Sequence, residues 1–263
     1  MAEKIKYPRR IHIAPVGFEI DRVVLPLIQM EADKVWLIAE RDPGLDKGRP
    51  YFDKVIEGIH EQNGKCEVKI QKCDFDGRDL YDVLRAYREI IEEEKDNQIF
   101  VNVSTGTKIH SIAGMMACMI FKDLAFGLIP YYAKPEDYLP LPAEGTQMST
   151  GCSEIYELPN YKIERPSEYL IKVLKVIDEQ CGSDVGKLTK RELIEVLVDR
   201  DLLPLSDSEG RTIRNVKVAR YLALQRKYIE PLISWGFIEI TGPKKRGKIQ
   251  LTKEGKNILK FLD

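Results

Sequence analysis

The chain has 263 residues with a formal net charge of −1, and 43% of its residues are hydrophobic and 32% charged. That length suits two domains, and no apolar run approaches the roughly 20 residues of a membrane span, which excludes a helical membrane protein. The first residues are charged, and the five cysteines form neither a CxxC pair nor a set with His at metal-ligand spacing. We therefore expect a soluble, cytoplasmic protein with reduced thiols, and no signal peptide, metal site or membrane partner.

Residues 10–135 alternate between strand-like and helix-like segments. The patterns predict strands at 11–16, 34–39, 66–70, 99–102 and 125–132, and helices at 21–31, 51–62, 79–94 and from the turn after 102 to 121. This alternation is typical of an α/β domain with a parallel-type, doubly wound, Rossmann-like sheet. In such sheets ligands bind at the carboxyl ends of the strands, near a topological switch point.

The most informative segment is the turn after the fourth strand, Asn102-Val103-Ser104-Thr105-Gly106-Thr107-Lys108. The first N–H groups of a helix have no intrahelical partners and lie at the positive end of its dipole, so an anion is favoured there. Ser104, Thr105 and Thr107 add hydroxyls, Gly106 allows close approach, and Lys108 adds a positive charge. The alternative is that these residues only cap the helix.

The turn after the first strand, Pro15-Val16-Gly17-Phe18-Glu19, lies at the same edge of the predicted sheet. Both turns can therefore face one pocket. Neither matches GxGxxG, and no GxxxxGK[ST] occurs in the chain, which disfavours a dinucleotide dehydrogenase or a P-loop NTPase.

Prolines and a Gly/Thr/Ser stretch make residues 135–166 irregular, and we expect a loop over the pocket followed by a linker that includes a short strand at 154–157. We place the ligand-sensing domain at 1–150, the linker at 151–166 and a second domain at 167–263. The second domain shows a helix from 167, a helix opening with the capping box Thr189-x-x-Glu192, and a helix at 213–235. A hairpin with a basic tip and a last helix at 253–262 follow.

Three helices and such a hairpin predict a winged helix-turn-helix. Residues 167–263 carry 19 Lys and Arg against 14 Asp and Glu, a weak sign of a polyanionic partner. On the third helix and the wing, the candidate DNA contacts are Arg214, Lys217, Arg220, Lys244, Lys245, Arg246 and Lys248. The alternative is a solvated, charged face on a winged helix that mediates protein contacts.

A Rossmann-like domain with an N-x-[ST]-x-G-[TR]-K turn, joined to a winged helix, resembles the archaeal CARF (CRISPR-associated Rossmann fold) winged-helix transcription regulators. The family's turn usually reads N-x-T-G-G-T-K, whereas Thr105 stands here at the first glycine position. The resemblance implies a homodimer that binds a cyclic oligoadenylate, most often cyclic tetra-adenylate, across its two-fold axis, and it implies no other cofactor. The ligand-binding residues implied by the resemblance are Asn102, Ser104, Thr105, Gly106, Thr107 and Lys108 for phosphate and ribose, with Val16, Gly17, Phe18 and Glu19 lining the adenine.

The leading hypothesis is a ligand-responsive regulator that binds double-stranded DNA, linked to CRISPR immunity. The alternative is a metal-independent ring nuclease in which Lys108 and nearby hydroxyls stabilise developing phosphate charge. His110 is a candidate acid or base for that reaction, but its position two residues after Lys108 favours packing on the helix. We therefore assign no catalytic residue. Phe18 fits either a base stack or a hydrophobic staple at the helix entry.

Overall fold

The computed structural model describes residues 7–40, 48–73, 79–140, 146–181, 188–203, 216–242 and 247–262. The chain divides into two compact units, Met1–Glu164 and Arg165–Asp263. Each unit has a hydrophobic core of its own.

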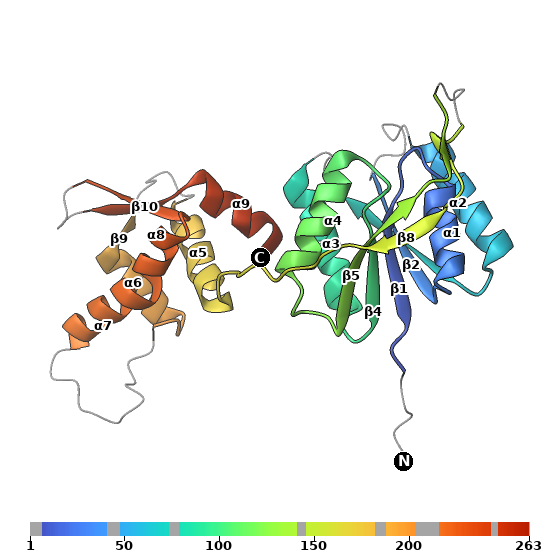
Figure 1. Ribbon diagram of the computed structural model, residues 1–263. Helices are drawn as coiled ribbons and strands as arrows, with labels where there is room; N and C mark the ends of the chain where they lie inside the picture. Colours follow the sequence, from blue (N-terminus) through green and yellow to red (C-terminus); the bar gives the residue numbers. More distant parts are fainter. Residues whose placement is uncertain are drawn as a thin grey trace, which may run out of the picture. The chain divides into compact units, whose positions relative to one another are not determined.

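The first unit alternates strands and helices (Figure 1). Its elements are β1 (Arg10–Pro15), α1 (Asp21–Gln29), β2 (Lys34–Glu40), α2 (Arg49–Gln62), β3 (Glu67–Cys73), α3 (Leu80–Glu93), β4 (Gln98–Asn102), α4 (Lys108–Ile120), β5 (Gly127–Lys134), β6 (Asp137–Tyr138), β7 (Ser149–Thr150) and β8 (Glu154–Glu157). The main sheet has the order β3-β2-β1-β4-β5-β8. Strands β1 to β5 are parallel, and β8 pairs antiparallel with β5.

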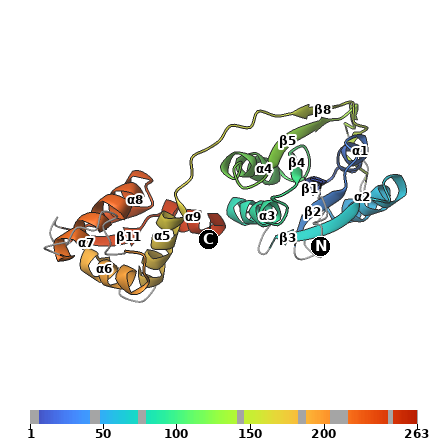
Figure 2. The ribbon, with the colours of Figure 1, turned by 90° about the horizontal axis from the view of Figure 1, so that it is seen from below.

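Helices α1 and α2 cover one face of this sheet, and α3 and α4 cover the other (Figure 2). Coverage on both faces explains why β1 and β2 are near-continuous runs of buried apolar residues. The edge strand β3 instead combines partly buried and exposed residues, and it ends in the buried Cys73. The predicted Rossmann-like fold is confirmed.

The segment after β5 differs from the predicted linker. Residues Glu154–Glu157 form β8, where the short strand was expected, and β8 belongs to the main sheet because its backbone pairs with β5. Residues 151–157 therefore continue the first unit, and the boundary between the two units falls after Glu164. Strands β6 and β7 form a separate two-stranded ladder that the sequence did not indicate.

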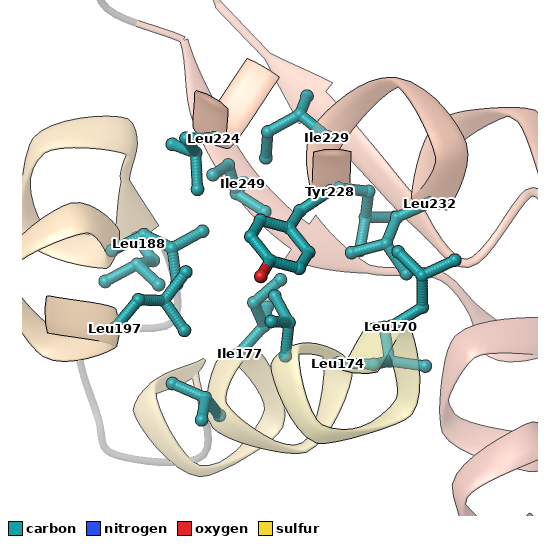
Figure 3. Packing of buried hydrophobic residues seen from close by; sticks show 14 of the residues in the cluster. Leu170, Leu174, Ile177, Leu188, Leu197, Leu224, Tyr228, Ile229, Leu232 and Ile249 are labelled. Carbon is teal, nitrogen blue, oxygen red and sulfur yellow. The ribbon is translucent and has the colours of Figure 1, made fainter. Parts of the chain in front are cut away.

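The second unit has the order of a winged helix. Its elements are α5 (Glu168–Cys181), β9 (Leu188–Thr189), α6 (Lys190–Asp199), α7 (Val216–Leu224), a π-helical turn η1 (Gln225–Ile229), α8 (Glu230–Ser234), β10 (Ile238–Thr241), β11 (Lys248–Leu251) and α9 (Lys253–Leu262). Strands β10 and β11 form the wing, and β9 pairs with β11. The helices and the wing enclose a core that includes Leu174, Leu224, Ile229 and Ile249 (Figure 3).

Two local features of this unit follow from its sequence. The predicted capping box is confirmed, because Thr189 Oγ1 accepts from the Glu192 N–H while the Glu192 carboxylate accepts from the Thr189 N–H. The predicted third helix is present from Val216, but a π turn interrupts it. That turn places Tyr228 in the core, where its hydroxyl donates to the Leu202 carbonyl at 2.7 Å.

Candidate functional sites

The carboxyl ends of β1 and β4 lie at the topological switch point of the main sheet. From β1 the chain proceeds to β2 and β3 on one side and then returns to β4 on the other side. The two turns predicted to form a pocket meet there: a Cβ built on Gly17 would lie 2.9 Å from the Gly106 Cα. The structure therefore brings the turn after β1 and the turn after β4 together, at the position where doubly wound sheets bind ligands.

The turn after β4 is fixed to β1 by two features. Gly106 has φ +77°, and a Cβ on it would lie 2.8 Å from the Pro15 Cβ. Thr105 is buried, and its hydroxyl donates to the Pro15 carbonyl at 2.8 Å. Glycine is required at 106 both for its left-handed backbone and for this close approach.

Asn102 and Ser104 form the other side of the turn. The Asn102 amide donates to the Arg22 carbonyl at 2.9 Å, and its oxygen accepts from the backbone N–H and the hydroxyl of Ser104. The Ser104 hydroxyl in turn accepts from the Ala133 N–H at 2.8 Å. Asn102 and Thr105 are both buried, with their side-chain polar groups bound to protein, and they shape the turn. Their role as ligand contacts stays a prediction.

The first residues of α4 are the ones that face solvent. Thr107 and Lys108 are exposed, and within the described residues the backbone N–H groups of Lys108 and Ile109 have no acceptor. Two unpaired N–H groups at the positive end of α4, next to the Lys108 ammonium, make this point suited to an anion.

His110 caps this helix. Its Nδ1 accepts from the Thr107 N–H at 3.2 Å, and its own N–H donates to Thr107 Oγ1 at 3.3 Å. Burial lowers the pKa of His110 to about 4, so the ring is neutral near pH 7. The expectation that His110 packs on the helix is confirmed, and it is not placed as an acid or base for a ligand on the exposed side.

The turn after β1 is only partly available to a ligand. Phe18 is 43% exposed, and its ring meets the edge of Tyr51 with centroids 5.3 Å apart. The Glu19 side chain is partly buried, and its carboxylate is engaged by protein: it accepts from the N–H and hydroxyl of Ser149 and lies 3.5 Å from the Arg22 guanidinium. Val16 donates its N–H to the Ile38 carbonyl. Of the residues predicted to line an adenine, Phe18 is the one with an exposed side chain.

Gln147, which no sequence pattern indicated, occupies the other helix N-terminus at the switch point. Its amide oxygen accepts from the N–H groups of Ile20 and Asp21 at 3.0 and 2.9 Å, and its amide donates to the Asp21 carboxylate at 2.8 Å. The start of α1 is therefore already capped by the chain itself, whereas the start of α4 keeps unpaired donors. No local pattern could have shown this, since the partners are 126 and 127 residues apart.

Replacing Gly106 with alanine should destabilise the first unit by about 1–3 kcal/mol, because a Cβ is disfavoured at positive φ and would clash with Pro15. Gly127→Ala is the matched control, since a Cβ there meets Gln98 at an ordinary 3.5 Å. Thermal unfolding of both variants measures the difference. Equal stability of the two would show that the turn relaxes freely.

The second unit carries a basic groove. A hollow of about 770 Å³ lies among α6, α7 and the wing, and its lining includes Lys190, Arg191, Lys217, Arg220 and Lys248 against one acidic residue, Glu195. Arg220 is half-buried, and its Nε has no acceptor among the described residues. The surplus of positive charge suits a polyanion.

The groove lining contains three of the predicted DNA contacts: Lys217, Arg220 and Lys248. The other four, Arg214, Lys244, Lys245 and Arg246, lie outside the described residues.

Two further findings concern membranes and metals. Within the described ranges, no helix is both long and apolar enough to cross a bilayer. The same ranges contain no group of three or more His, Cys, Asp or Glu residues arranged to hold a metal ion.

Two family models match the chain, one for each unit. A model described as "HFX_2341_N:-like, N-terminal" matches residues 10–138. The DUF6293 C-terminal winged helix domain matches residues 170–263. The chain is therefore a two-domain protein with a Rossmann-like N-terminal domain and a C-terminal winged helix of the DUF6293 type. A Rossmann-like domain followed by a winged helix is the domain composition that the sequence predicted.

The chain is also similar to one curated relative. It is 32% identical over 136 residues to the uncharacterized protein MJ1513 of Methanocaldococcus jannaschii, a match that covers 49% of this chain and 39% of the relative. The chain thus spans well under half of that relative's length.

Solved structures with a similar chain path include three proteins. Csm6 of Enterococcus italicus, bound to cyclic hexa-2′-fluoro-hexa-dAMP, is 13% identical with a TM-score of 0.41, covering 88% of this chain and 56% of Csm6. Can2 of Sulfobacillus thermosulfidooxidans, in complex with cyclic tetra-adenylate, is 14% identical with a TM-score of 0.38, covering 95% and 63%. A type III CRISPR defence DNA nuclease activated by cyclic oligoadenylate is 10% identical with a TM-score of 0.35, covering 94% and 38%.

Proposed function

We propose that this protein is a homodimeric DNA-binding regulator that senses a cyclic oligoadenylate at the switch point of its Rossmann-like domain. The observation that carries the sensing role is the exposed start of α4, where Lys108 and two unpaired N–H groups adjoin the close contact of Gly17 with Gly106. Backbone donors beside a cation are the chemistry that binds phosphate. The choice of a cyclic oligoadenylate follows from the resemblance of the Asn102–Lys108 turn to that of CARF regulators.

The dimer is supported by the surface of α4. Most residues of α4 are apolar, and several of them are not covered by the rest of the first unit. Ile112 is 50% exposed, and Met115, Met116 and Met119 are half-buried. A helix with apolar residues on its outer side is suited to a contact with a second copy. Two-fold pairing would offer the same donors twice to a ring with equivalent phosphates.

The DNA-binding role is supported by the basic groove of the winged helix. For the ligand to regulate DNA binding, it must bind the two states of the dimer with different affinity.

Lys108→Ala should weaken binding of cyclic tetra-adenylate by about 10- to 30-fold, since it removes a charge-assisted contact to phosphate. Isothermal titration calorimetry on the full chain measures the affinity and the number of ligands per chain, and chromatography of the recovered ligand shows whether it is intact. We expect one intact ligand per two chains.

Lys65→Ala is the matched control, because Lys65 is an exposed lysine just before β3, at the opposite end of the strands. It should bind the ligand as the unaltered protein does. Unchanged affinity in Lys108→Ala would remove that residue from the site, and absence of binding by the unaltered protein would overturn the proposed ligand. A linear product would show that the domain cleaves its ligand.

A further inference from the structure

The helix that lines the basic groove also exposes apolar side chains. Leu222 is 47% exposed, Tyr221 is 44% exposed and Val218 is 51% exposed. Val218 and Leu222 are four residues apart, so they share one face of α7, and Tyr221 lies between that face and the groove. Basic residues on α7 can contact phosphates, but exposed aliphatic side chains cannot. The aliphatic side chains therefore suggest a second kind of contact.

Tyr221 connects the two surfaces. It lines the groove, and the Lys190 ammonium lies over its ring, 5.4 Å from the centroid. The same ammonium donates to the Gln225 side chain at 2.8 Å, so it is fixed against α7. The ring therefore sits between a lysine and the aliphatic face, and any partner that lies along α7 touches charge and apolar surface together.

We infer that Leu222, with Val218, contacts the 5-methyl groups of thymine in the DNA major groove, and that the protein therefore selects A·T pairs at those positions. This inference rests on the proposed DNA binding. The 5-methyl group of thymine is an apolar group exposed in the major groove, and apolar side chains can contact it there. The basic groove beside them supplies the attraction for the phosphates that flank the bases.

A second copy of the chain fits this surface less well. A two-fold contact places the same patch on both partners. Lys217 is exposed on the same helix and lines the basic groove with Arg220, Lys190 and Lys248. Pairing through this face would bring two basic surfaces together, which costs free energy.

The test uses the full chain and a duplex recovered from a random 30-base-pair pool by repeated binding and elution. Each thymine of that duplex is then replaced in turn by uracil, which removes the methyl and leaves the hydrogen-bonding edge intact. At one or more positions uracil should weaken binding by about three- to fivefold, the effect of exposing one buried methyl. Leu222→Ala should lose this discrimination while keeping the salt dependence, because no charge is removed.

Ile233→Ala is the matched control, since Ile233 is a 44% exposed aliphatic residue in α8, away from the groove lining. It should keep the full response to uracil. Equal binding of thymine and uracil duplexes by the unaltered protein, or an unchanged response in Leu222→Ala, would overturn the inference and leave DNA binding standing. A pool with no enrichment and no salt-dependent binding would overturn the proposed DNA binding itself, and the inference with it.

Discussion

Replacing Lys217 and Lys248 together with alanine should lower DNA affinity by about 10- to 100-fold near physiological salt and reduce the salt slope, d log K/d log[salt], by about two units. Both side chains are exposed and line the groove, one from α7 and one from the wing strand β11. Within the described residues neither side chain has a hydrogen bond or a close ion pair. The Lys248 charge also acts on the Glu192 carboxylate and helps to lower its pKa, but the ammonium is exposed and can contact phosphate. Each contact releases about one counterion, which is why the slope reports the number of contacts.

The matched control is the double variant Lys65→Ala and Lys95→Ala, which removes two exposed charges from the first unit. It changes the net charge of the chain equally, so any difference between the two double variants belongs to the groove. The measurement is fluorescence anisotropy of a labelled duplex at several salt concentrations. A fall in affinity with an unchanged slope would show that the groove does not touch phosphate, and the DNA-binding proposal would then lose its structural support.

Most of the fold could be predicted because it depends on local patterns. Helix α9 and strand β8 lie where their sequences placed them, and the capping box at Thr189 forms as written. Apolar residues at helical spacing, such as Leu84 and Ile91 of α3, turned inward because one face of a helix must be buried. Each of these patterns lies within about a dozen consecutive residues, so the sequence alone is enough to recognise it.

The candidate site could be predicted only in part, because its details depend on partners that are distant in sequence. The turn after β4 was identified from its residues, but the Asn102 amide binds the Arg22 carbonyl, 80 residues away, and Thr105 binds the Pro15 carbonyl, 90 residues away. A buried polar group needs a partner, and sequence alone does not say whether that partner is a ligand or the chain itself. The same limit hid the role of Gln147 at the start of α1.

Consequently, the two helix N-termini at the switch point have different roles. At the start of α1 the Gln147 amide oxygen accepts from the N–H groups of Ile20 and Asp21, so these two groups need no ligand. The start of α4 is capped by His110 through the Thr107 N–H, which leaves the next two N–H groups unpaired. We therefore propose that an anion at the carboxyl ends of these strands binds at the start of α4, beside the exposed Lys108.

At the opposite end of the strands, Glu94 should contribute strongly to the stability of the first unit. Glu94 is 3% exposed, and its carboxylate accepts from the Lys34 ammonium at 2.7 Å, the Trp36 indole at 2.9 Å and the Asn97 amide at 2.9 Å. Glu94→Ala leaves the buried Lys34 with only the more distant Glu67 carboxylate, 3.8 Å away, as an ion-pair partner. We expect a loss of about 3 kcal/mol, the lower end of the range for a broken buried pair. Glu94→Gln keeps the size of the side chain and should lose less.

The effect should depend on pH. Burial opposes the charged form of Glu94, but hydrogen bonds from Lys34, Trp36 and Asn97 outweigh it and hold the pKa of this carboxyl below its usual value. A depressed folded-state pKa stabilises the protein above the unfolded-state value of about 4.3, and this contribution is lost as the pH falls through the folded-state pKa. The difference in stability between the unaltered protein and Glu94→Gln should therefore be largest near pH 7 and shrink below about pH 4.3.

Urea unfolding followed by tryptophan fluorescence measures this difference. The chain has two tryptophans, and in a Trp235→Phe background Trp36 alone reports on the first unit, from a position in direct contact with Glu94. The control is Glu93→Gln, which neutralises an exposed neighbour and should change stability by no more than about 0.5 kcal/mol at any pH. If Glu94→Gln lost as much stability at about pH 3 as at pH 7, the cluster would act through packing and hydrogen-bond geometry, and not through the charge of the carboxylate.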